Sequence, residues 1–134
     1  MDALKAVDVK RSYAERKVLD GFSLALGEGE FAALMGPSGS GKSTFLHIAA
    51  GLINADGGYV EIGGEDILSM CDSSAARFRR RNIGVVFQSY NLLPSLSVAD
   101  NILLPVRLDH GRADKTRLVE LIEKLGLKGL EKKL

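Results

Sequence analysis

The sequence predicts a mixed fold of the α/β or α+β class, and three observations support this prediction. Short apolar stretches with the character of strands occupy the first 35 residues. A glycine-rich loop then leads directly into a helix-like segment, Ser43–Ala50. A continuous apolar run, Ile83–Phe87, has the composition of a strand buried on both faces, and helical periodicity follows it. Strands followed by mixed strands and helices indicate a sheet packed against helices.

The N-terminal third is expected to form short strands joined by turns. Residues Leu4–Val9 alternate between apolar and polar side chains, as a half-buried strand does, whereas Arg11–Arg16 is polar and typical of a loop. The segment from residue 17 to residue 35 reads as further strands, with turns at Gly21 and at Gly27–Gly29. The last of these strands is Phe31–Met35, directly before the glycine-rich loop.

The rest of the chain alternates between turns, one further strand region and helices. Residues 54–58 form a turn, and residues 59–66 form a strand that enters a Gly-Gly turn. Asp72 is expected to cap a short helix that ends near Arg81. A helix is expected within Val98–Leu104, and a second one ends at Gly126, because Leu118, Leu121, Ile122 and Leu125 share one helical face.

Composition and charge argue against several classes of protein. The chain has 134 residues, enough for one modest domain, and its 18 basic and 17 acidic side chains give a net charge of +1, which argues against a dedicated nucleic-acid-binding protein. The basic run Arg77–Arg81 is interpreted as a solvated helix face. The single cysteine, Cys71, cannot form an internal disulfide and is expected to be an inert thiol in a reducing, intracellular setting. No apolar run reaches the length of a signal peptide core or a membrane span.

The glycine-rich loop carries the clearest chemistry. Residues Gly36–Ser43 read GPSGSGKS and match the pattern GxxxxGK[ST] at every position. Phosphate oxygens need several donors at once, and a glycine-rich backbone can curl so that its N–H groups surround the anion at the positive end of the following helix. Lys42 is expected to reach the β- and γ-phosphates, and the Ser43 hydroxyl is expected to bind Mg²⁺. The predicted phosphate-binding residues are Gly36, Pro37, Ser38, Gly39, Ser40, Gly41, Lys42, Ser43 and Thr44.

Two longer stretches, Ser12–Leu52 and Ile83–Pro105, resemble the ATP-binding subunit of an ABC transporter. The resemblance runs from Leu4 to the end of the chain, and Phe87–Pro105 is similar to the lipoprotein-releasing and macrolide-export type. It implies an α/β P-loop NTPase fold of the ABC ATPase type. Residues 1–88 would form the nucleotide-binding core, with an antiparallel β subdomain and part of a parallel core sheet, and residues 89–134 would begin the helical subdomain.

The resemblance assigns roles to two further residues. Tyr13 falls where the family places an aromatic ring that stacks on adenine; the alternative is an ordinary exposed loop tyrosine. Gln88 matches a glutamine that contacts Mg²⁺ or the attacking water and senses the membrane partner; the alternative is a polar cap on a strand end. Residues Tyr90–Leu96 would dock the membrane partner, although Leu92 and Leu93 could instead pack the start of the helical subdomain.

The family also implies ATP and Mg²⁺ as cofactors, with Lys42 and Gln88 as catalytic residues. The implied partners are a transmembrane permease subunit and a second ATPase subunit in a homodimer, with no nucleic acid. The implied location is the cytoplasmic face of the cell membrane, reached through the permease. ATP hydrolysis would then drive export or lipoprotein release.

Several parts of the family pattern do not occur within these 134 residues. The sequence has no Ser-Gly-Gly signature segment, and Pro105 and Arg107 disqualify Ile102–Asp109 as a central strand that ends in acidic residues. The chain is therefore expected to be part of a longer ATPase. The alternative is a remnant that binds nucleotide, or binds an interaction partner, but does not hydrolyse ATP. A parallel sheet without its central strand would expose apolar faces and strand edges, so self-association is also expected.

Overall fold

The computed structural model describes residues 2–134, which form two compact units. The first unit ends at Val85 and the second is Val86–Leu134. The sequence places a boundary after Gln88, close to this division. The assignment of a nucleotide-binding part and a helical part to the two sides stays a prediction.

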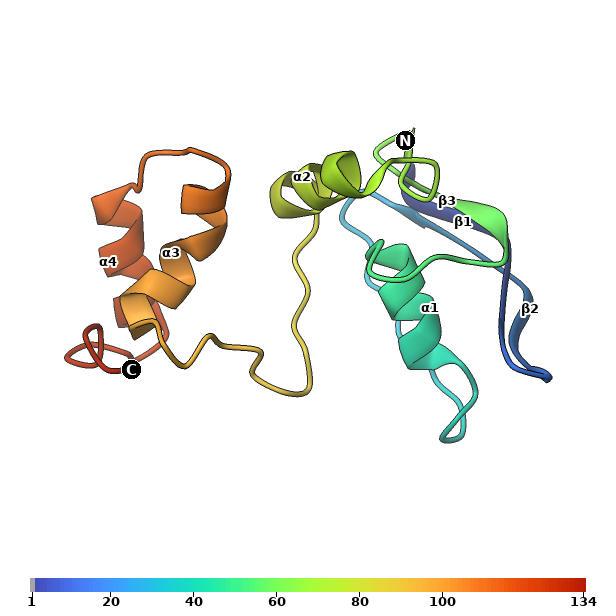
Figure 1. The fold of residues 1–134 in the computed structure, drawn as a ribbon, viewed down its shortest axis with the longest axis horizontal. Helices are drawn as coiled ribbons and strands as arrows, with labels where there is room; N and C mark the ends of the chain where they lie inside the picture. The colour runs from blue at the N-terminus through green and yellow to red at the C-terminus, as the bar shows by residue number, and fades with distance from the viewer. Residues whose placement is uncertain (1) are drawn as a thin grey trace. The chain divides into compact units, whose positions relative to one another are not determined.

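The first unit is built on a four-stranded antiparallel sheet (Figure 1). Strands β1 (Asp2–Tyr13) and β2 (Arg16–Gly27) form a long hairpin, and β3 (Gly57–Ile62) and β4 (Glu65–Asp66) add to the β1 side in the order β2-β1-β3-β4. The predicted Gly-Gly turn is confirmed between β3 and β4. Both glycines, Gly63–Gly64, have positive φ, which suits a two-residue hairpin turn.

The β1–β2 hairpin corrects two predictions. The expected loop Arg11–Arg16 is mostly strand, and only residues 14 and 15 form the turn, because β1 and β2 pair as far as Tyr13 and Arg16. Gly21 is not a turn either. Val9 pairs with Phe22 and the next residue pairs with Asp20, so Gly21 is an extra residue inside β2 with φ of 84°. This is a β-bulge, which glycine favours because it tolerates positive φ.

Helix α1 (Lys42–Ala49) packs its apolar side on the sheet. Ile48 is fully buried, and the rings of Phe45 and Phe22 lie 4.5 Å apart between centroids. The predicted stop at Gly51 is confirmed: its N–H donates to the Ile48 carbonyl oxygen, with φ of 63°. The buried core of the unit consists of Ala6, Val9, Leu19, Phe45, Ile48, Ala49, Val60 and Ile67.

Helix α2 (Asp72–Asn82) has nearly the predicted length but a different start. The N-cap is Cys71 and Asp72 is the first helical residue, so Asp72 does not cap the helix. The interpretation of the basic run as a purely solvated face is wrong for Arg79. Its Nη1 donates a partly buried hydrogen bond of 2.7 Å to the Gly51 carbonyl oxygen, which ties α2 to the end of α1.

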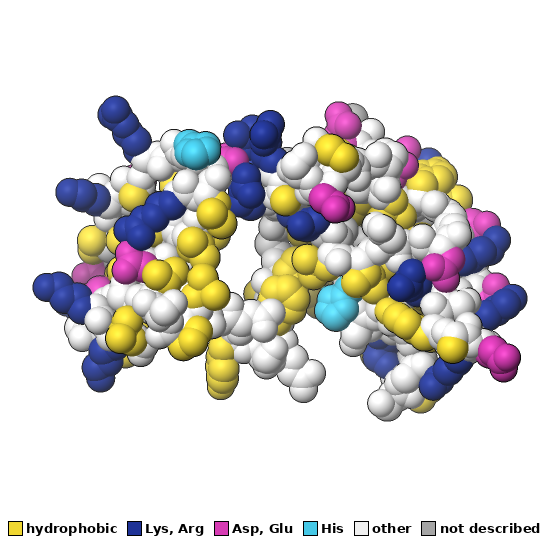
Figure 2. Space-filling view, in the orientation of Figure 1, with side chains coloured by type: hydrophobic (Ala, Val, Ile, Leu, Met, Phe, Trp, Pro, Cys, Tyr) yellow, Lys and Arg dark blue, Asp and Glu magenta, His cyan; other side chains and the backbone are white. Residues whose placement is uncertain are grey.

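The two strands predicted for a parallel sheet, Phe31–Met35 and Ile83–Phe87, are not formed. Neither segment joins a ladder, and the sheet within residues 2–134 is antiparallel throughout. Phe31 and Met35 are 93% and 89% exposed, and Val86 is fully exposed. A strand needs a neighbour to satisfy its N–H and C=O groups, and no described segment supplies one for these two. Figure 2 shows hydrophobic side chains on the surface of both units.

The second unit contains two helices, α3 (Val98–Leu108) and α4 (Lys115–Lys124). Helix α3 continues beyond the predicted Leu104 and includes Pro105, and the Ser97 side chain caps its start by accepting from the Asp100 N–H. Helix α4 ends with Gly126 in the left-handed region, as the sequence predicts. Within residues 2–134, none of the helices has the length and apolar character needed to cross a membrane.

Candidate functional site

The loop between the sheet and α1 has the backbone that its glycines predict. Gly36, Gly39 and Gly41 have φ values of 152°, 77° and 90°, which side chains rarely allow. At Gly41, the N-cap of α1, an added Cβ would lie 2.7 Å from the Val18 carbonyl oxygen. Glycine is therefore required here by both conformation and close packing, and this packing sets the loop against β2.

Lys42 closes the loop on itself. Its Nζ donates to the carbonyl oxygens of Gly36 at 2.9 Å and Pro37 at 2.7 Å, and it lies 3.2 Å from Ser40 Oγ. The ammonium group thus lies within the curl of the loop. The first turn of α1 carries no acidic residue, so no carboxylate there offsets the positive end of the helix dipole.

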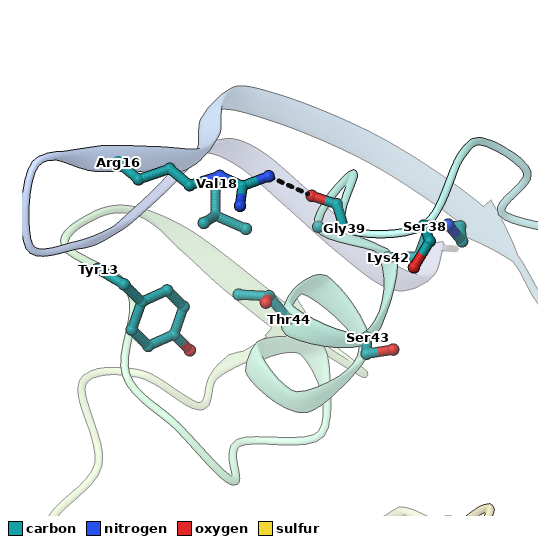
Figure 3. Close-up of a pocket in the computed structure, with 9 residues that line it drawn as sticks. Tyr13, Arg16, Val18, Ser38, Gly39, Lys42, Ser43 and Thr44 are labelled. Carbon is teal, nitrogen blue, oxygen red and sulfur yellow. Dashed lines mark hydrogen bonds between the residues drawn. The ribbon is translucent and has the colours of Figure 1, made fainter.

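A cleft of about 550 Å³ opens beside this loop (Figure 3). Three parts of the first unit meet in it: the turn end of the β1–β2 hairpin, the glycine-rich loop and the first turn of α1. The cleft is lined by Tyr13, Arg16, Val18, Ser38, Gly39, Gly41, Lys42, Ser43 and Thr44. Tyr13 lies across from Thr44 in Figure 3, and its side chain is about half exposed.

The structure brings together most of the residues that the sequence singles out. Gly36, Pro37 and Ser40 belong to the same loop, although they line a neighbouring, more apolar pocket of about 240 Å³. Gln88 is an exposed residue of the second unit, so its role beside Mg²⁺ stays a prediction. No group of three or more His, Cys, Asp or Glu side chains with metal-binding geometry occurs in the described part of the chain.

Arg16 is a cleft residue that sequence reasoning missed. It begins β2, and its Nη2 donates to the Gly39 carbonyl oxygen at 3.3 Å, which links the hairpin to the glycine-rich loop (Figure 3). In the sequence it is one charged residue in a polar stretch. Only the register of the hairpin places it at the cleft.

The sequence is similar to those of known ATP-binding proteins. The family model described as ABC transporter matches residues 19–134. The lipoprotein-releasing system ATP-binding protein LolD 1 of Rhodopseudomonas palustris is 40% identical, over 94% of this chain and 59% of its own length. The uncharacterized ABC transporter ATP-binding protein YvcR of Bacillus subtilis is 38% identical, over 96% of this chain and 52% of its own length.

Solved structures show the same likeness. A dimeric ATP-binding cassette, MJ0796, in a post-hydrolysis state with ADP and phosphate, superposes with a TM-score of 0.85 at 31% identity. The match covers 97% of this chain and 60% of that cassette. The chain therefore has the fold of the corresponding part of an ATP-binding cassette, and it spans between 52% and 60% of the length of these relatives.

Proposed function

The chain belongs to the ABC transporter family, and on this premise we propose that the cleft of the first unit binds ATP together with Mg²⁺. The observation that carries the proposal is the arrangement around Lys42. Its ammonium lies inside a loop of three positive-φ glycines, at the start of α1, and Tyr13 lines the same cleft. A curled glycine-rich backbone at a helix N-terminus is suited to bind phosphate groups.

Each part of the cleft has a proposed role. The N–H groups of the loop and of the first turn of α1 hold the phosphates, and Lys42 exchanges its carbonyl contacts for the β- and γ-phosphate oxygens. The Ser43 hydroxyl is exposed on the cleft and is suited to hold Mg²⁺, with Gln88 as a second contact. When bound, Mg²⁺ would neutralise part of the phosphate charge. The Tyr13 ring stacks on the adenine base.

We further propose that the whole protein hydrolyses ATP and couples hydrolysis to lipoprotein release or export. The relatives named as lipoprotein-releasing ATP-binding proteins support this assignment. The proposed partners are a transmembrane permease subunit and a second ATPase subunit, and the proposed location is the inner face of the cell membrane. These properties are assigned to the whole protein because the chain spans only 52% to 60% of the length of the relatives described above.

Calorimetric titration of the chain with Mg²⁺-ATP tests the proposal. We expect binding of one nucleotide per chain, and we expect Lys42→Ala to abolish it, because both the cationic contact and the closure of the loop are lost. Lys17→Ala is a matched control, since Lys17 is an exposed hairpin lysine that pairs with Asp20 outside the cleft. Tight binding that is untouched by Lys42→Ala would refute the assignment of the loop.

A further inference from the structure

We propose that Arg11 and Asp56 are positioning residues that hold the Tyr13 ring for stacking, with one ring face covered by the guanidinium and the other left for a base. The inference rests on the proposed function and deepens it. Neither residue lines the cleft. They would therefore act on the nucleotide only through the ring, Arg11 directly and Asp56 through Arg11.

Arg11 is the link between the carboxylate and the ring. Its guanidinium carbon lies over the Tyr13 ring, 5.0 Å from the centroid, and its Nη1 donates to Asp56 Oδ1 at 2.8 Å. The Tyr13 contact, and then the charge of Asp56, raise the pKa of Arg11 above its ordinary value, so the group stays charged at any pH used to measure binding. A cation over an aromatic face is attracted by the ring.

Asp56 is itself fixed to the backbone of β1. Its Oδ2 accepts a hydrogen bond of 2.6 Å from the Ser12 N–H, and its own N–H donates to the Lys10 carbonyl oxygen at 2.8 Å. Asp56 is therefore anchored to the residues on both sides of Arg11, through its carboxylate to Ser12 and through its backbone N–H to Lys10. This anchoring ties the segment before β3 to the end of β1, so the orientation of Tyr13 depends on a residue 43 positions further along the chain.

The position of Tyr13 explains why its ring needs contacts that fix its orientation. It is the last residue of β1, directly before Ala14 with φ of 52°, and its side chain is 48% exposed. A half-exposed aromatic side chain at a strand end has several staggered rotamers within reach. Holding one of them before the nucleotide arrives reduces the ordering that binding requires. With Arg11 on one face, a base can stack only on the other.

The test compares a ligand that has a base with one that lacks it. Mg²⁺-ATP and Mg²⁺-tripolyphosphate are titrated into the unmodified chain, Arg11→Gln, Arg11→Lys, Asp56→Asn and Tyr13→Ala. Base stacking is worth about 5- to 150-fold in affinity, so we expect Tyr13→Ala to weaken ATP binding by that factor. Arg11→Gln should weaken it by a smaller factor, about 3- to 10-fold. Tripolyphosphate binding should change by less than about 2-fold in each variant, because the loop is untouched.

Four comparisons separate positioning from a structural role. Arg11→Lys keeps the charge but not the planar group, so it should restore part of the ATP affinity. Asp56→Asn keeps an acceptor for Ser12 and serves as the second variant should Arg11→Gln fail to fold. Arg11→Gln should have no further effect in a Tyr13→Ala background. Lys17→Gln, on the same hairpin, should leave the binding of both ligands unchanged.

Two results would overturn the proposal. The first is an equal loss of ATP and tripolyphosphate affinity in Arg11→Gln and Asp56→Asn, which would show that the pair supports the fold and not the ring. The second is unchanged ATP binding in both variants. Failure of the unmodified chain to bind either ligand would instead refute the proposed function, so the two failures are distinguishable.

Discussion

The side chain of Lys42 is held by the glycine-rich loop, with which it is proposed to bind phosphate groups. Its ammonium is bound by two carbonyl oxygens, and these contacts fix the curl of residues 36–41 before any ligand is present. A phosphate oxygen would offer a stronger, charge-assisted partner than a neutral carbonyl. The same side chain thus accounts for the shape of the loop and for its proposed affinity for phosphate groups.

Cys71 is more acidic than the sequence suggests. Its Sγ lies 3.4 Å from Ser73 Oγ and 3.3 Å from Ser74 Oγ, and hydrogen bonds with these hydroxyls lower the pKa of Cys71 from 9.0 to about 7. Because the folded pKa is depressed, these contacts stabilise the folded state above pH 9, and this contribution is lost as the pH falls through 7. The expectation of an inert thiol stays a prediction, and the lowered pKa argues against it.

The rate of Cys71 alkylation by iodoacetamide should therefore rise with a midpoint near pH 7, because the thiolate is the nucleophile. The double variant Ser73→Ala, Ser74→Ala should shift this midpoint upward, toward the ordinary value for cysteine. The chain unfolded in urea supplies the reference midpoint. A midpoint close to the reference value in the folded, unmodified chain would contradict the hydrogen-bonded geometry.

At the scale of secondary-structure elements, the packing of α1 against β2 depends on one glycine, Gly41. Gly29→Ala and Gly41→Ala both place a side chain at positive φ, but only Gly41 has a close neighbour, the Val18 carbonyl oxygen. Gly29→Ala should cost about 1–2 kcal/mol of unfolding free energy from backbone strain. Gly41→Ala should cost about 1–3 kcal/mol more from overpacking. Urea unfolding followed by circular dichroism measures both, and equal losses would show that the contact is unimportant.

The sequence predicts helix ends and turns correctly where a few adjacent residues determine them. The helix stops at Gly51 and Gly126 and the Gly-Gly turn before β4 each depend on a few adjacent residues, and the structure confirms them. The bulge at Gly21 was missed because it depends on the register between β1 and β2. The apolar runs that begin at Phe31 and Ile83 match the composition of strands, but a strand also needs a paired neighbour, which composition does not supply.

The same distinction holds for the candidate site. The loop motif predicted the position of Lys42 and the glycine conformations because its spacing is local. Tyr13 was singled out only through the family resemblance, and the structure places it in the cleft. Arg16 and the Arg11–Asp56 pair carry no local signal. Their positions follow from hairpin register and from a contact across 45 residues of sequence.

At the scale of the whole molecule, exposed apolar side chains predict self-association. Phe31 and Met35 are about 90% exposed, and Val86 and Tyr90 are exposed to a similar extent. Leaving about 400 Å² of apolar surface in water would forgo about 10 kcal/mol of hydrophobic stabilisation. A contact between two chains that covers this surface should therefore be favourable. Light scattering of the purified chain should show a dimer or a larger species. Phe31→Ser with Met35→Ser should shift it toward monomer, and a compact, cooperatively melting monomer of 14.4 kDa would contradict this prediction.

The central claim is that ATP binds at the loop of residues 36–43 and the Tyr13 side of the cleft. Hydrogen–deuterium exchange of the chain, with and without saturating Mg²⁺-ATP, tests it most directly because it reports protection along the backbone whatever the oligomeric state. We predict that protection centres on peptides that cover residues 36–44, with a smaller effect at the turn after Tyr13, and that Lys42→Ala removes both. Nucleotide-dependent protection that omits residues 36–44, or that persists in Lys42→Ala, would contradict the claim.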